Sequence, residues 1–397
     1  MKIAKTVKLG LSIALVSMFV GCGDTEDDKK DTPNSTNQQE NGNSSGDNNS
    51  NSGNGSDSEE ETGIKPSTTS FIVKMKTFQD SNNENFVYIP TFLNYNDFNY
   101  SVDWGDGTSN TELTKGQRHT YSNEGTYTVS ISGVYPQISG MCPFSIEQWG
   151  DMQWRTMREV LECPSNKVQL NASDIPNLAH VTDMSSLFSD VIINSDISSW
   201  DVSTVVNMSA MFAGNEDFNQ DISSWDVSNV MDMNSMFHGT DSFNQDISSW
   251  DVSNVKTMFS MFNSSKFNQD ISSWDVSNVS DMANMFRNNK SFNQDISTWD
   301  VSNVESMLVM FSKAKAFNQN LGSWDISKVR RSIGIDDTNL STINYDKILM
   351  GWIDNIDIQN NINLNVGNTK YSKKAQRARF NLIDKYNWKI LDGGLAK

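Results

Sequence analysis

Tryptophan residues recur through the middle of the chain at a nearly constant interval. Consecutive members of the series are separated by 25, 25, 24, 25 and 25 residues. The series consists of Trp200, Trp225, Trp250, Trp274, Trp299 and Trp324. A fixed period of this length is the signature of a stacked repeat array, or solenoid, in which each unit buries its apolar face against its neighbours. The pattern therefore predicts six stacked coils with a buried tryptophan in each.

The apolar positions inside one repeat, residues 218–237, follow two different periods. They are Phe218, Ile222, Trp225, Val227, Val230, Met233, Met236 and Phe237. The Ile-x-x-Trp-x-Val part copies the strand signature of leucine-rich repeats, and the Val-x-x-Met-x-x-Met part has helical spacing. We therefore expect each repeat to be a short strand followed by one or two turns of helix.

The single 24-residue interval shows where a repeat tolerates change. Five residues separate Phe237 from Phe243, whereas four residues separate Phe262 from Phe267. The missing residue falls in the loop between the predicted helix and the next strand, and we call this loop the rim. The rim loops are residues 213–217, 238–242, 263–266, 287–291 and 312–316.

Alternation along the predicted strand sends polar residues outward. If Trp225 and Val227 point inward, Asp226 points to solvent, and the repeats then line one face with a column of carboxylates. The column comprises Asp201, Asp226, Asp251, Asp275, Asp300 and Asp325. Strands about 4.8 Å apart would give a polar face roughly 24 Å long. Its like charges need relief from Ser and Asn hydrogen bonds, from bound cations or from a basic partner.

A second set of repeated polar residues has a structural interpretation. We expect the repeated asparagines to satisfy backbone groups at the turn of each coil, and the aspartate before each isoleucine to do the same. The asparagines are Asn219, Asn244, Asn268, Asn293 and Asn318.

Residues 71–134 have a different pattern, in which short apolar or aromatic runs are separated by Asn, Asp and Gly turns, as in a compact all-β domain. Within it, VDWGDGT followed by HTYSNEGTYTVSISG resembles the polycystic-kidney-disease (PKD) domain, an immunoglobulin-like sandwich. The resemblance implies that Trp104 fills the sandwich core. Gly105 and Gly107 would then permit a tight turn whose amides Asp106 caps.

Two alternatives concern the polar residues of this domain. Asp103 and Asp106 are either turn formers or calcium ligands. His119 is expected to be packed or exposed rather than catalytic.

The N-terminal residues predict export. Lys2, Lys5 and Lys8 precede an apolar run from Leu9 to Val20, which is typical of a signal peptide. The run ends in FVGC, which resembles the lipobox of bacterial lipoproteins and implies that Cys22 carries the lipid. An ordinary cleaved signal with an incidental cysteine is the alternative.

Residues 23–63 are rich in Gly, Ser, Asn and acidic residues and contain no aromatic or large aliphatic residue. Such a segment cannot bury enough surface to offset its ordering entropy, so we expect a flexible tether. Its random-coil span is roughly 35 Å. A tether of this length suits a lipid-anchored domain held clear of a membrane.

Charge and cysteine content narrow the function further. The 397-residue chain has a formal net charge of -18, so it would repel a nucleic-acid backbone, and removal of the signal peptide makes it more acidic. Cys142 and Cys163 either form a disulfide, as export allows, or are two buried thiols.

The repeated phrase FNQDISSWDVSNVxxMxxMF resembles the BspA-like leucine-rich-repeat surface proteins of bacteria, which are adhesins or presumed to be so. Residues 138–195 and 336–397 look like the opening and closing segments of that family. The closing segment predicts a helix near 345–352 and a second helix capped by Ser372, with strands near 362–366 and 388–391. Its basic residues Lys373, Lys374, Arg377 and Arg379 form either a solvated helix face or an anion or lipid-headgroup site.

The expected fold is mainly β with short helices: an immunoglobulin-like, PKD-type β-sandwich, then a leucine-rich-repeat-like α/β solenoid with a C-terminal cap. The expected layout is a signal peptide (1–21), a lipidated Cys and disordered tether (22–63), a PKD-like sandwich (64–137), an N-terminal cap (138–195), BspA-like repeats (196–335) and a C-terminal cap (336–397).

No known catalytic, metal or nucleotide motif is present, and the three histidines lie in different segments. We therefore expect a non-enzymatic lipoprotein of the bacterial envelope, exposed at the outer membrane, that presents its acidic face to an extracellular protein or glycan. No cofactor is expected, with weak calcium binding by the aspartate column as an open variant. The alternatives are a self-assembling envelope scaffold and a carbohydrate-processing lipoprotein that uses Glu147, Glu159 or Glu162.

Overall fold

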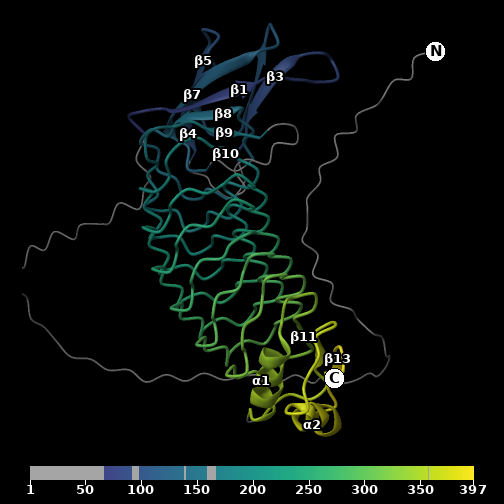
Figure 1. Ribbon diagram of the computed structural model, residues 1–397. Coiled ribbons are helices and arrows are strands. Elements are labelled where there is room, and N and C mark those ends of the chain that lie inside the picture. The colour runs from purple at the N-terminus through teal and green to yellow at the C-terminus, as the bar shows by residue number, and fades with distance from the viewer. Residues whose placement is uncertain (1–66, 92–97, 138–139, 159–166, 356) are drawn as a thin grey trace, which may run out of the picture. The chain divides into compact units, whose positions relative to one another are not determined.

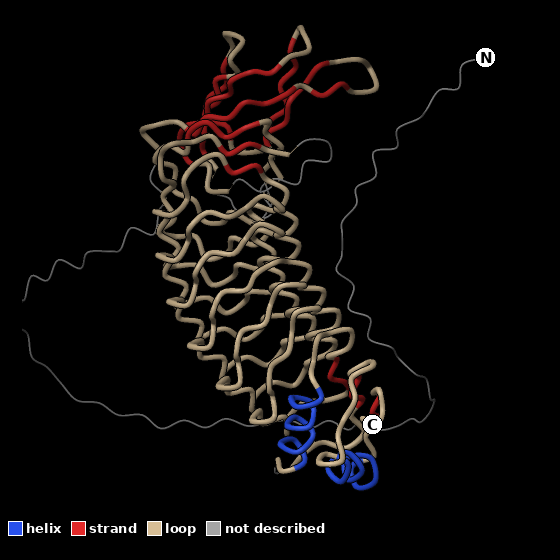
Figure 2. Tube along the Cα trace, in the orientation of Figure 1, coloured by secondary structure: helices blue, strands red, loops and turns tan. Residues whose placement is uncertain are grey.

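The described residues fold mainly into β structure and contain two short helices (Figures 1 and 2). The computed structural model describes residues 67–91, 98–137, 140–158, 167–355 and 357–397. Internal contacts divide the chain after Glu60, and every described residue belongs to the second part. The predicted signal peptide, Cys22 and the tether lie outside the described residues.

Two β-sheets share one core at the start of the described chain. The strands are β1 (Phe71–Lys76), β2 (Phe78–Gln79), β3 (Asn85–Ile89), β4 (Asn99–Asp103), β5 (Ser109–Leu113), β6 (Gln117–Tyr121) and β7 (Thr126–Val134). Strands β2, β3 and β6 form one sheet, while β1, β7, β4 and β5 are neighbours in the other. Alternate residues such as Val73 of β1 and Val87 of β3 are fully buried in a common cluster with Trp104. The alternation of polar and apolar residues thus produces two sheets with one buried face each.

The second sheet continues directly toward the repeats. Strand β8 (Ser145–Gln148) pairs antiparallel with β1, and then β9 (Gln169–Leu170) and β10 (Ile192–Ile193) add in parallel, which gives the order β10-β9-β8-β1-β7-β4-β5. Figure 1 shows these three strands between the first sheet and the coils. The change from antiparallel to parallel pairing at β8 marks where the chain begins to coil in one direction.

The repeats form successive coils joined by parallel bridges at a single residue per coil. These bridges link Asp183, Asn207, Asp232, Thr257, Asp281 and Ser306, each to the next. Backbone hydrogen bonds extend the pairing on both sides: the amides of Met208, Ala210 and Phe212 donate to carbonyls of the next coil at 2.7–3.0 Å. Each coil is therefore held to its neighbour along one edge by backbone contacts.

The expected helix in each repeat is wrong. Within the described residues no helix is present between Gln169 and Gly334; the Met-x-x-Met-Phe segment is instead a series of tight turns. Alternate amides are used differently: Met236 donates to Met233 within the coil, whereas Ser235 donates to Phe259 of the next coil. Ser235 has a φ of 55°, in the left-handed region, and equivalent residues of the other coils share it. Successive turns closed between residues three apart place apolar side chains at the same spacing as a helix does. The sequence pattern therefore does not distinguish the two structures.

The expected strand position is also wrong. The Ile-x-x-Trp and Val-x-x-Val segments form turns closed by hydrogen bonds from Trp225 to Ile222 and from Val230 to Val227. The bridge lies instead at Asp232, just before Met233. Burial nevertheless follows the expected alternation, since Trp225 and Val227 are buried and Asp226 is exposed. A sequence pattern reports which side chains are buried more directly than it reports backbone pairing.

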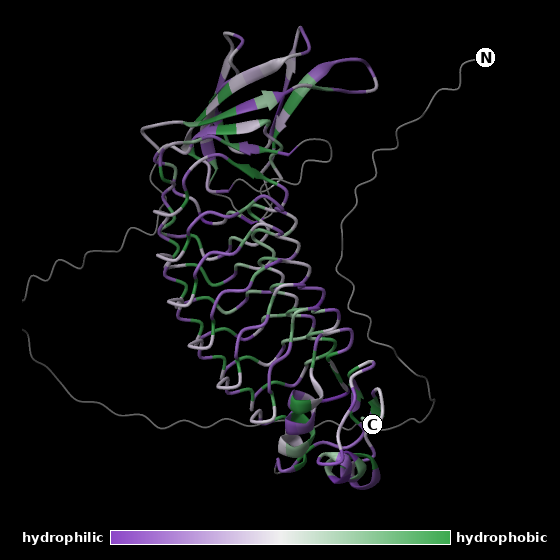
Figure 3. Ribbon diagram, in the orientation of Figure 1, coloured by the Kyte–Doolittle hydropathy of each residue, from purple (hydrophilic) through white to green (hydrophobic). Residues whose placement is uncertain are grey.

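Aromatic side chains run through the core as continuous stacks. Phe212, Phe237 and Phe262 lie ring on ring with centroids 5.6–5.7 Å apart and interplanar angles of 4°. Each repeat tryptophan is at most 4% exposed, and in the five from Trp225 to Trp324 the indole N–H donates to an isoleucine carbonyl of the preceding coil, as Trp250 does to Ile222 at 3.1 Å. Figure 3 shows hydrophobic and hydrophilic segments alternating around the coils. The tryptophan thus both fills the core and bonds one coil to the last.

The 24-residue repeat is absorbed without loss of register. Its two phenylalanines, Phe262 and Phe267, stack at 4.2 Å, close to the 4.1 Å between Phe237 and Phe243 in the preceding coil. The shortened rim is therefore where the missing residue is accommodated, as its position in the sequence predicts.

Polar side chains form further ladders between coils. Asn244 Oδ1 accepts the amide of Asn268 at 2.8 Å, and Asn268 Oδ1 accepts that of Asn293 at 2.9 Å. Gln269 Nε2 donates to the carbonyl of Asn244 at 2.9 Å. Asn254 and its equivalents donate in the same way to serine carbonyls of the preceding coil: Asn229 to Ser203, Asn254 to Ser228, Asn278 to Ser253 and Asn303 to Ser277. The asparagines therefore satisfy backbone groups, as expected, but in the neighbouring coil.

The C-terminal cap continues the parallel pairing with three strands and two helices. They are β11 (Ser332–Gly334), α1 (Thr342–Ile353), β12 (Asn363–Asn365), α2 (Gln376–Tyr386) and β13 (Lys389–Leu391). The positions of all four predicted cap elements are confirmed, but the predicted cap by Ser372 is wrong: α2 has Ala375 at its N-cap position without a side-chain hydrogen bond, and the Ser372 hydroxyl donates to Asp346 instead. Ser341 caps α1 by accepting the amide of Asn344, and Trp352 Nε1 donates to the carbonyl of Leu321 at 2.8 Å, which repeats the bond of the coils.

Replacement of Trp250 by Phe should lower the free energy of unfolding by about 3 kcal/mol, because it removes the indole hydrogen bond to the Ile222 carbonyl of the preceding coil and opens a cavity in the core. Urea denaturation followed by circular dichroism measures the loss. Met231→Ala is the control, since Met231 is 48% exposed and its loss should cost less than about 0.5 kcal/mol. Equal effects of the two variants would contradict a structural role for the indole.

Candidate functional site

The aspartates that follow each tryptophan form an exposed column, which we call the Trp-side column. Its members are Asp201, Asp226, Asp251, Asp275, Asp300 and Asp325. In every coil Oδ1 accepts the amide of the serine two residues on, at 2.9–3.1 Å, as Asp251 does from Ser253. Hydrogen bonds from this serine lower the pKa of Asp251 and keep it ionised at neutral pH.

A second exposed column precedes the isoleucines, and we call it the Ile-side column. It consists of Asp196, Asp221, Asp246, Asp270 and Asp295. Each member caps a serine amide in the same way, at 2.9–3.0 Å, and for four of them this lowers the pKa. The charge of Asp221 acts to raise the pKa of Asp246, and Asp246 acts likewise on Asp270. Neighbouring carboxylates therefore repel one another here, in a column to which the sequence assigned only a turn-forming role.

The carboxylates differ from the other repeated polar groups in what they contact. Asn, Gln, Ser and Trp side chains bond to the neighbouring coil, whereas each column aspartate uses one oxygen for an amide of its own turn. The coils thus carry two columns of exposed carboxylates. Such an arrangement attracts cationic groups and is screened by salt.

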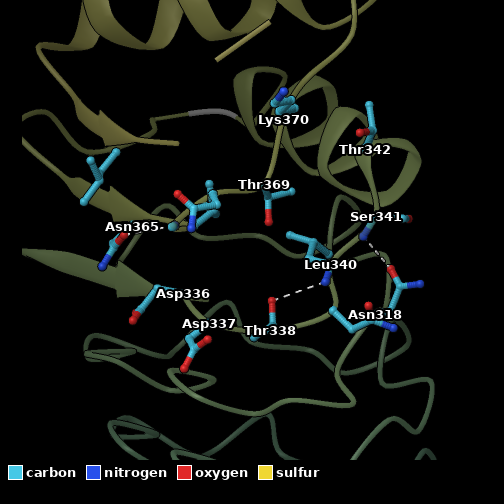
Figure 4. Close-up of a pocket in the computed structure, with 15 residues that line it drawn as sticks. Asn318, Asp336, Asp337, Thr338, Leu340, Ser341, Thr342, Asn365, Thr369 and Lys370 are labelled. Atoms are coloured by element: carbon cyan, nitrogen blue, oxygen red, sulfur yellow. Dashed lines mark hydrogen bonds between the residues drawn. The ribbon is translucent and has the colours of Figure 1, made fainter. Parts of the chain in front are cut away.

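Figure 4 shows a polar cleft of about 970 Å³ where the last coil meets the cap. Loops 336–342 and 365–370 provide most of its lining. The asparagine ladder ends here, since Asn318 Oδ1 accepts the amide of Ser341 at 2.8 Å, and Thr338 Oγ1 accepts that of Leu340 at 3.3 Å. The sequence did not predict this cleft, because it forms only when the cap docks against the coils.

One buried acceptor in this cleft lacks a partner among the described residues. Asp336 Oδ2 accepts the hydroxyl of Ser312 at 3.1 Å, but its Oδ1 is buried without a hydrogen bond. The adjacent Asp337 is paired with Lys315. A buried carboxylate oxygen of this kind is an acceptor for a ligand hydroxyl or ammonium group.

The WGDG loop is organised as a turn supported by aromatic packing. Asp106 Oδ1 accepts the amide of Thr108 at 3.0 Å, and Gly105 and Gly107 have φ values of 75° and 88°. His119 stacks on Trp104 with centroids 4.6 Å apart, and its Nε2 lies 2.9 Å from Asp106 Oδ2. These contacts make Asp106 a turn former and His119 a packed residue, in line with the structural alternative stated for each.

The remaining candidate residues are placed as follows. Cys142 is disulfide-bonded, while its predicted partner Cys163 lies outside the described residues, as do Glu159 and Glu162. Glu147 accepts hydrogen bonds from Ser145 and Asn171 and lies 3.4 Å from the Lys74 ammonium. These contacts lower its pKa, which is opposite to the shift that a general acid requires.

The basic helix of the cap is only partly available to a ligand. Lys373, Lys374 and Arg377 are exposed, but Arg379 is bound to Asp392 through two hydrogen bonds of 2.6 and 3.2 Å. The Tyr345 hydroxyl donates to the same carboxylate at 2.9 Å. Arg379 therefore joins α2 to the C-terminal segment.

No group of three or more His, Cys, Asp or Glu side chains in the described part of the chain is arranged to hold a metal ion. Within those same residues, neither helix has the length and apolar character that crossing a bilayer requires.

Comparison with known proteins identifies one similar family. Residues 155–266 and 251–337 match the family described as "Mycoplasma protein of unknown function, DUF285". The matched residues cover the coils and somewhat less than half of the chain. This similarity supports a relationship to the BspA-like family that the repeat sequence resembles. No curated protein and no solved structure matches the chain.

Stability of the WGDG loop should depend on pH. Hydrogen bonds from Thr108 and then His119 lower the pKa of Asp106 from 3.8 to about 2, so ionised Asp106 stabilises the fold above about pH 4 and this contribution is lost as the pH falls toward 2. Urea unfolding midpoints of Asp106→Asn should therefore fall less steeply than those of the wild type over this range. Parallel pH profiles of the two proteins would contradict the assignment.

Calcium should not stabilise the coils. Calcium requires six to eight oxygen ligands, whereas the columns offer one carboxylate per coil at each position, already engaged by a serine amide. The melting temperature should therefore agree within about 1 °C between chelator and millimolar calcium, because a ligand shifts stability only if it binds the folded state. A larger increase with calcium would restore the calcium-binding variant.

Proposed function

We propose that this chain is a non-enzymatic, lipid-anchored binding module of the bacterial cell surface, whose coils present two aspartate columns to a cationic partner, protein or glycan. The observation that carries the proposal is the division of polar groups in the coils: most of them bond neighbouring coils, and the exposed, ionised carboxylates remain directed at solvent. A regular row of like charges on a stacked support favours an extended partner of opposite charge.

The finer assignments belong to the same proposal. We infer that the coils are a solenoid of the BspA-like leucine-rich-repeat type and that the N-terminal sheets are a PKD-type, immunoglobulin-like sandwich that acts as a spacer. The repeat sequence, the WGDG loop and the family similarity support these assignments. The lipobox-like FVGC and the tether support anchoring through Cys22 at the outer membrane, with the domain exposed to the exterior.

Neutralisation of the Trp-side column should weaken partner binding at least tenfold. The variant Asp226→Asn, Asp251→Asn and Asp275→Asn keeps Oδ1 as acceptor for the serine amides, so the turns are retained while three charges are lost. Full-length protein in detergent is screened against extracellular proteins and glycans, and bound partners are then titrated against the variant at low and high salt.

The matched control removes three charges from the rim instead, by Glu216→Gln, Asp217→Asn and Asp241→Asn. It should bind nearly as well as the wild type. Equal losses of affinity in both variants would show that binding depends on net charge alone. Absence of any partner, together with unchanged cell attachment by a deletion strain, would overturn the proposal in favour of an envelope scaffold, which crosslinking on intact cells detects as self-adducts.

A further inference from the structure

A pocket on the rim gathers cationic side chains in an otherwise acidic protein. Its volume is about 300 Å³, and it is lined by His238, Asn263, Ser264, Arg287, Asn288 and Lys313. These residues come from the rim loops of four consecutive coils. All six carry hydrogen-bond donors and none is a carboxylate, although the chain has a net charge of -18. We call it the rim pocket.

The positive charges of the rim pocket form no ion pair with any described residue. Among the ion pairs of the described residues, none includes Arg287 or Lys313. Nearby rim lysines are paired, by contrast: Lys266 lies 3.3 Å from Asp241. Burial lowers the pKa of His238, so the charge at neutral pH comes from Arg287 and Lys313.

The polar floor of the pocket is held in place by its own hydrogen bonds. Asn263 is 9% exposed, and its Oδ1 accepts the Ser264 hydroxyl at 3.0 Å. Asn288 Nδ2 donates to the same hydroxyl oxygen at 3.1 Å. These amides and the hydroxyl are therefore oriented before any ligand arrives, which reduces the entropic cost of binding.

The backbone at Lys313 adds an independent observation. Lys313 has a φ of 63°, in the left-handed region that favours glycine, and its amide donates to the carbonyl of Asp336 at 2.8 Å. The equivalent residue of the four earlier coils is Gly214, Gly239, Ser264 or Asn288, with φ values of 73°, 70°, 57° and 59°. A lysine where glycine suffices is a conformational cost, and such costs concentrate where the side chain has a function.

We propose that the rim pocket binds the carboxylate or sulfate group of an acidic saccharide. Arg287 and Lys313 contact the oxyanion, and the amides and hydroxyl of the floor bond to the sugar hydroxyls. A saccharide fits better than a nucleic acid, because the two aspartate columns repel a dense polyanion but leave a sparsely charged chain with one anionic group per sugar pair free to approach. The site is separate from the columns and does not depend on the function proposed for them.

The test measures binding of full-length protein in detergent to a hexasaccharide of alternating uronic acid and N-acetylhexosamine, at low salt, by isothermal titration calorimetry. The same hexasaccharide with its carboxyls reduced to alcohols is the neutral comparison, and its sulfated derivative is the second anionic probe. We expect one or both anionic forms to bind at least tenfold more tightly than the reduced form. Equal binding of all three, or no binding, would overturn the proposal.

Lys313→Gly and Arg287→Gln should each weaken binding of the anionic hexasaccharide at least tenfold. Lys313→Gly should leave the melting temperature unchanged or raised, since glycine already occupies this position in two coils, and this separates loss of binding from misfolding. Lys290→Gln is the matched control, because Lys290 shares a rim loop with Arg287 but does not line the pocket.

Two results would contradict the assignment: unchanged affinity in Lys313→Gly, or an equal loss in Lys290→Gln, which would indicate attraction by charge alone. The triple Asp→Asn variant of the Trp-side column should bind the hexasaccharide at least as well as the wild type. Failure of the column proposal and failure of the rim-pocket proposal are thereby distinguishable.

Discussion

The coils are joined by hydrogen bonds that side chains donate to the backbone of the preceding coil. The Trp250 indole reaches Ile222, the Asn254 amide reaches Ser228, and the Gln245 amide reaches Asn219. Backbone pairing is confined to the turns around each Met-Phe pair, because most of a coil bends too sharply to form a continuous ladder. Away from these turns, Trp, Asn and Gln side chains supply bonds between coils, and these residue types recur at their positions in most repeats.

These bonds separate the polar residues into two groups. One group bonds neighbouring coils and recurs in most of them, although Thr204 and Lys328 stand where the inner coils have asparagine. The other consists of the aspartates, whose turn-capping role uses one oxygen, and of the rim, whose residues differ from coil to coil because no inter-coil bond depends on most of their side chains. Most of the repeated residues are therefore explained by their role in holding the coils together. The residues that vary from coil to coil are the ones that can make ligand binding specific.

Burial was predictable from the sequence, and backbone conformation was not. The tryptophans, Val227 and the exposed Asp226 follow from a pattern that sorts residues by side. The predicted helix failed because successive turns and helices both place apolar residues three apart, and Ser235 adopts a left-handed conformation without the glycine that would signal it. The positions of the cap helices were predicted correctly. Helix α1 is longer than the turns of the coils, has an N-capping serine and packs one apolar face.

The two pockets were missed for different reasons. The cap cleft depends on how loops 336–342 and 365–370 meet, and no local pattern encodes that meeting. The rim pocket was accessible in principle, because alignment of the repeats on their tryptophans places His238 and Arg287 at one position in different coils. Read along the chain, these residues are about 50 positions apart and look unrelated.

The ladders also have a consequence for how such arrays change over evolutionary time. Each coil offers its neighbour the same donors and acceptors that it receives, so the surface exposed by removing one coil is complementary to the surface of the next. Recombination between near-identical gene segments can therefore delete or duplicate a whole unit and still leave every junction matched. Array length becomes a freely adjustable property, while the two caps keep both ends closed.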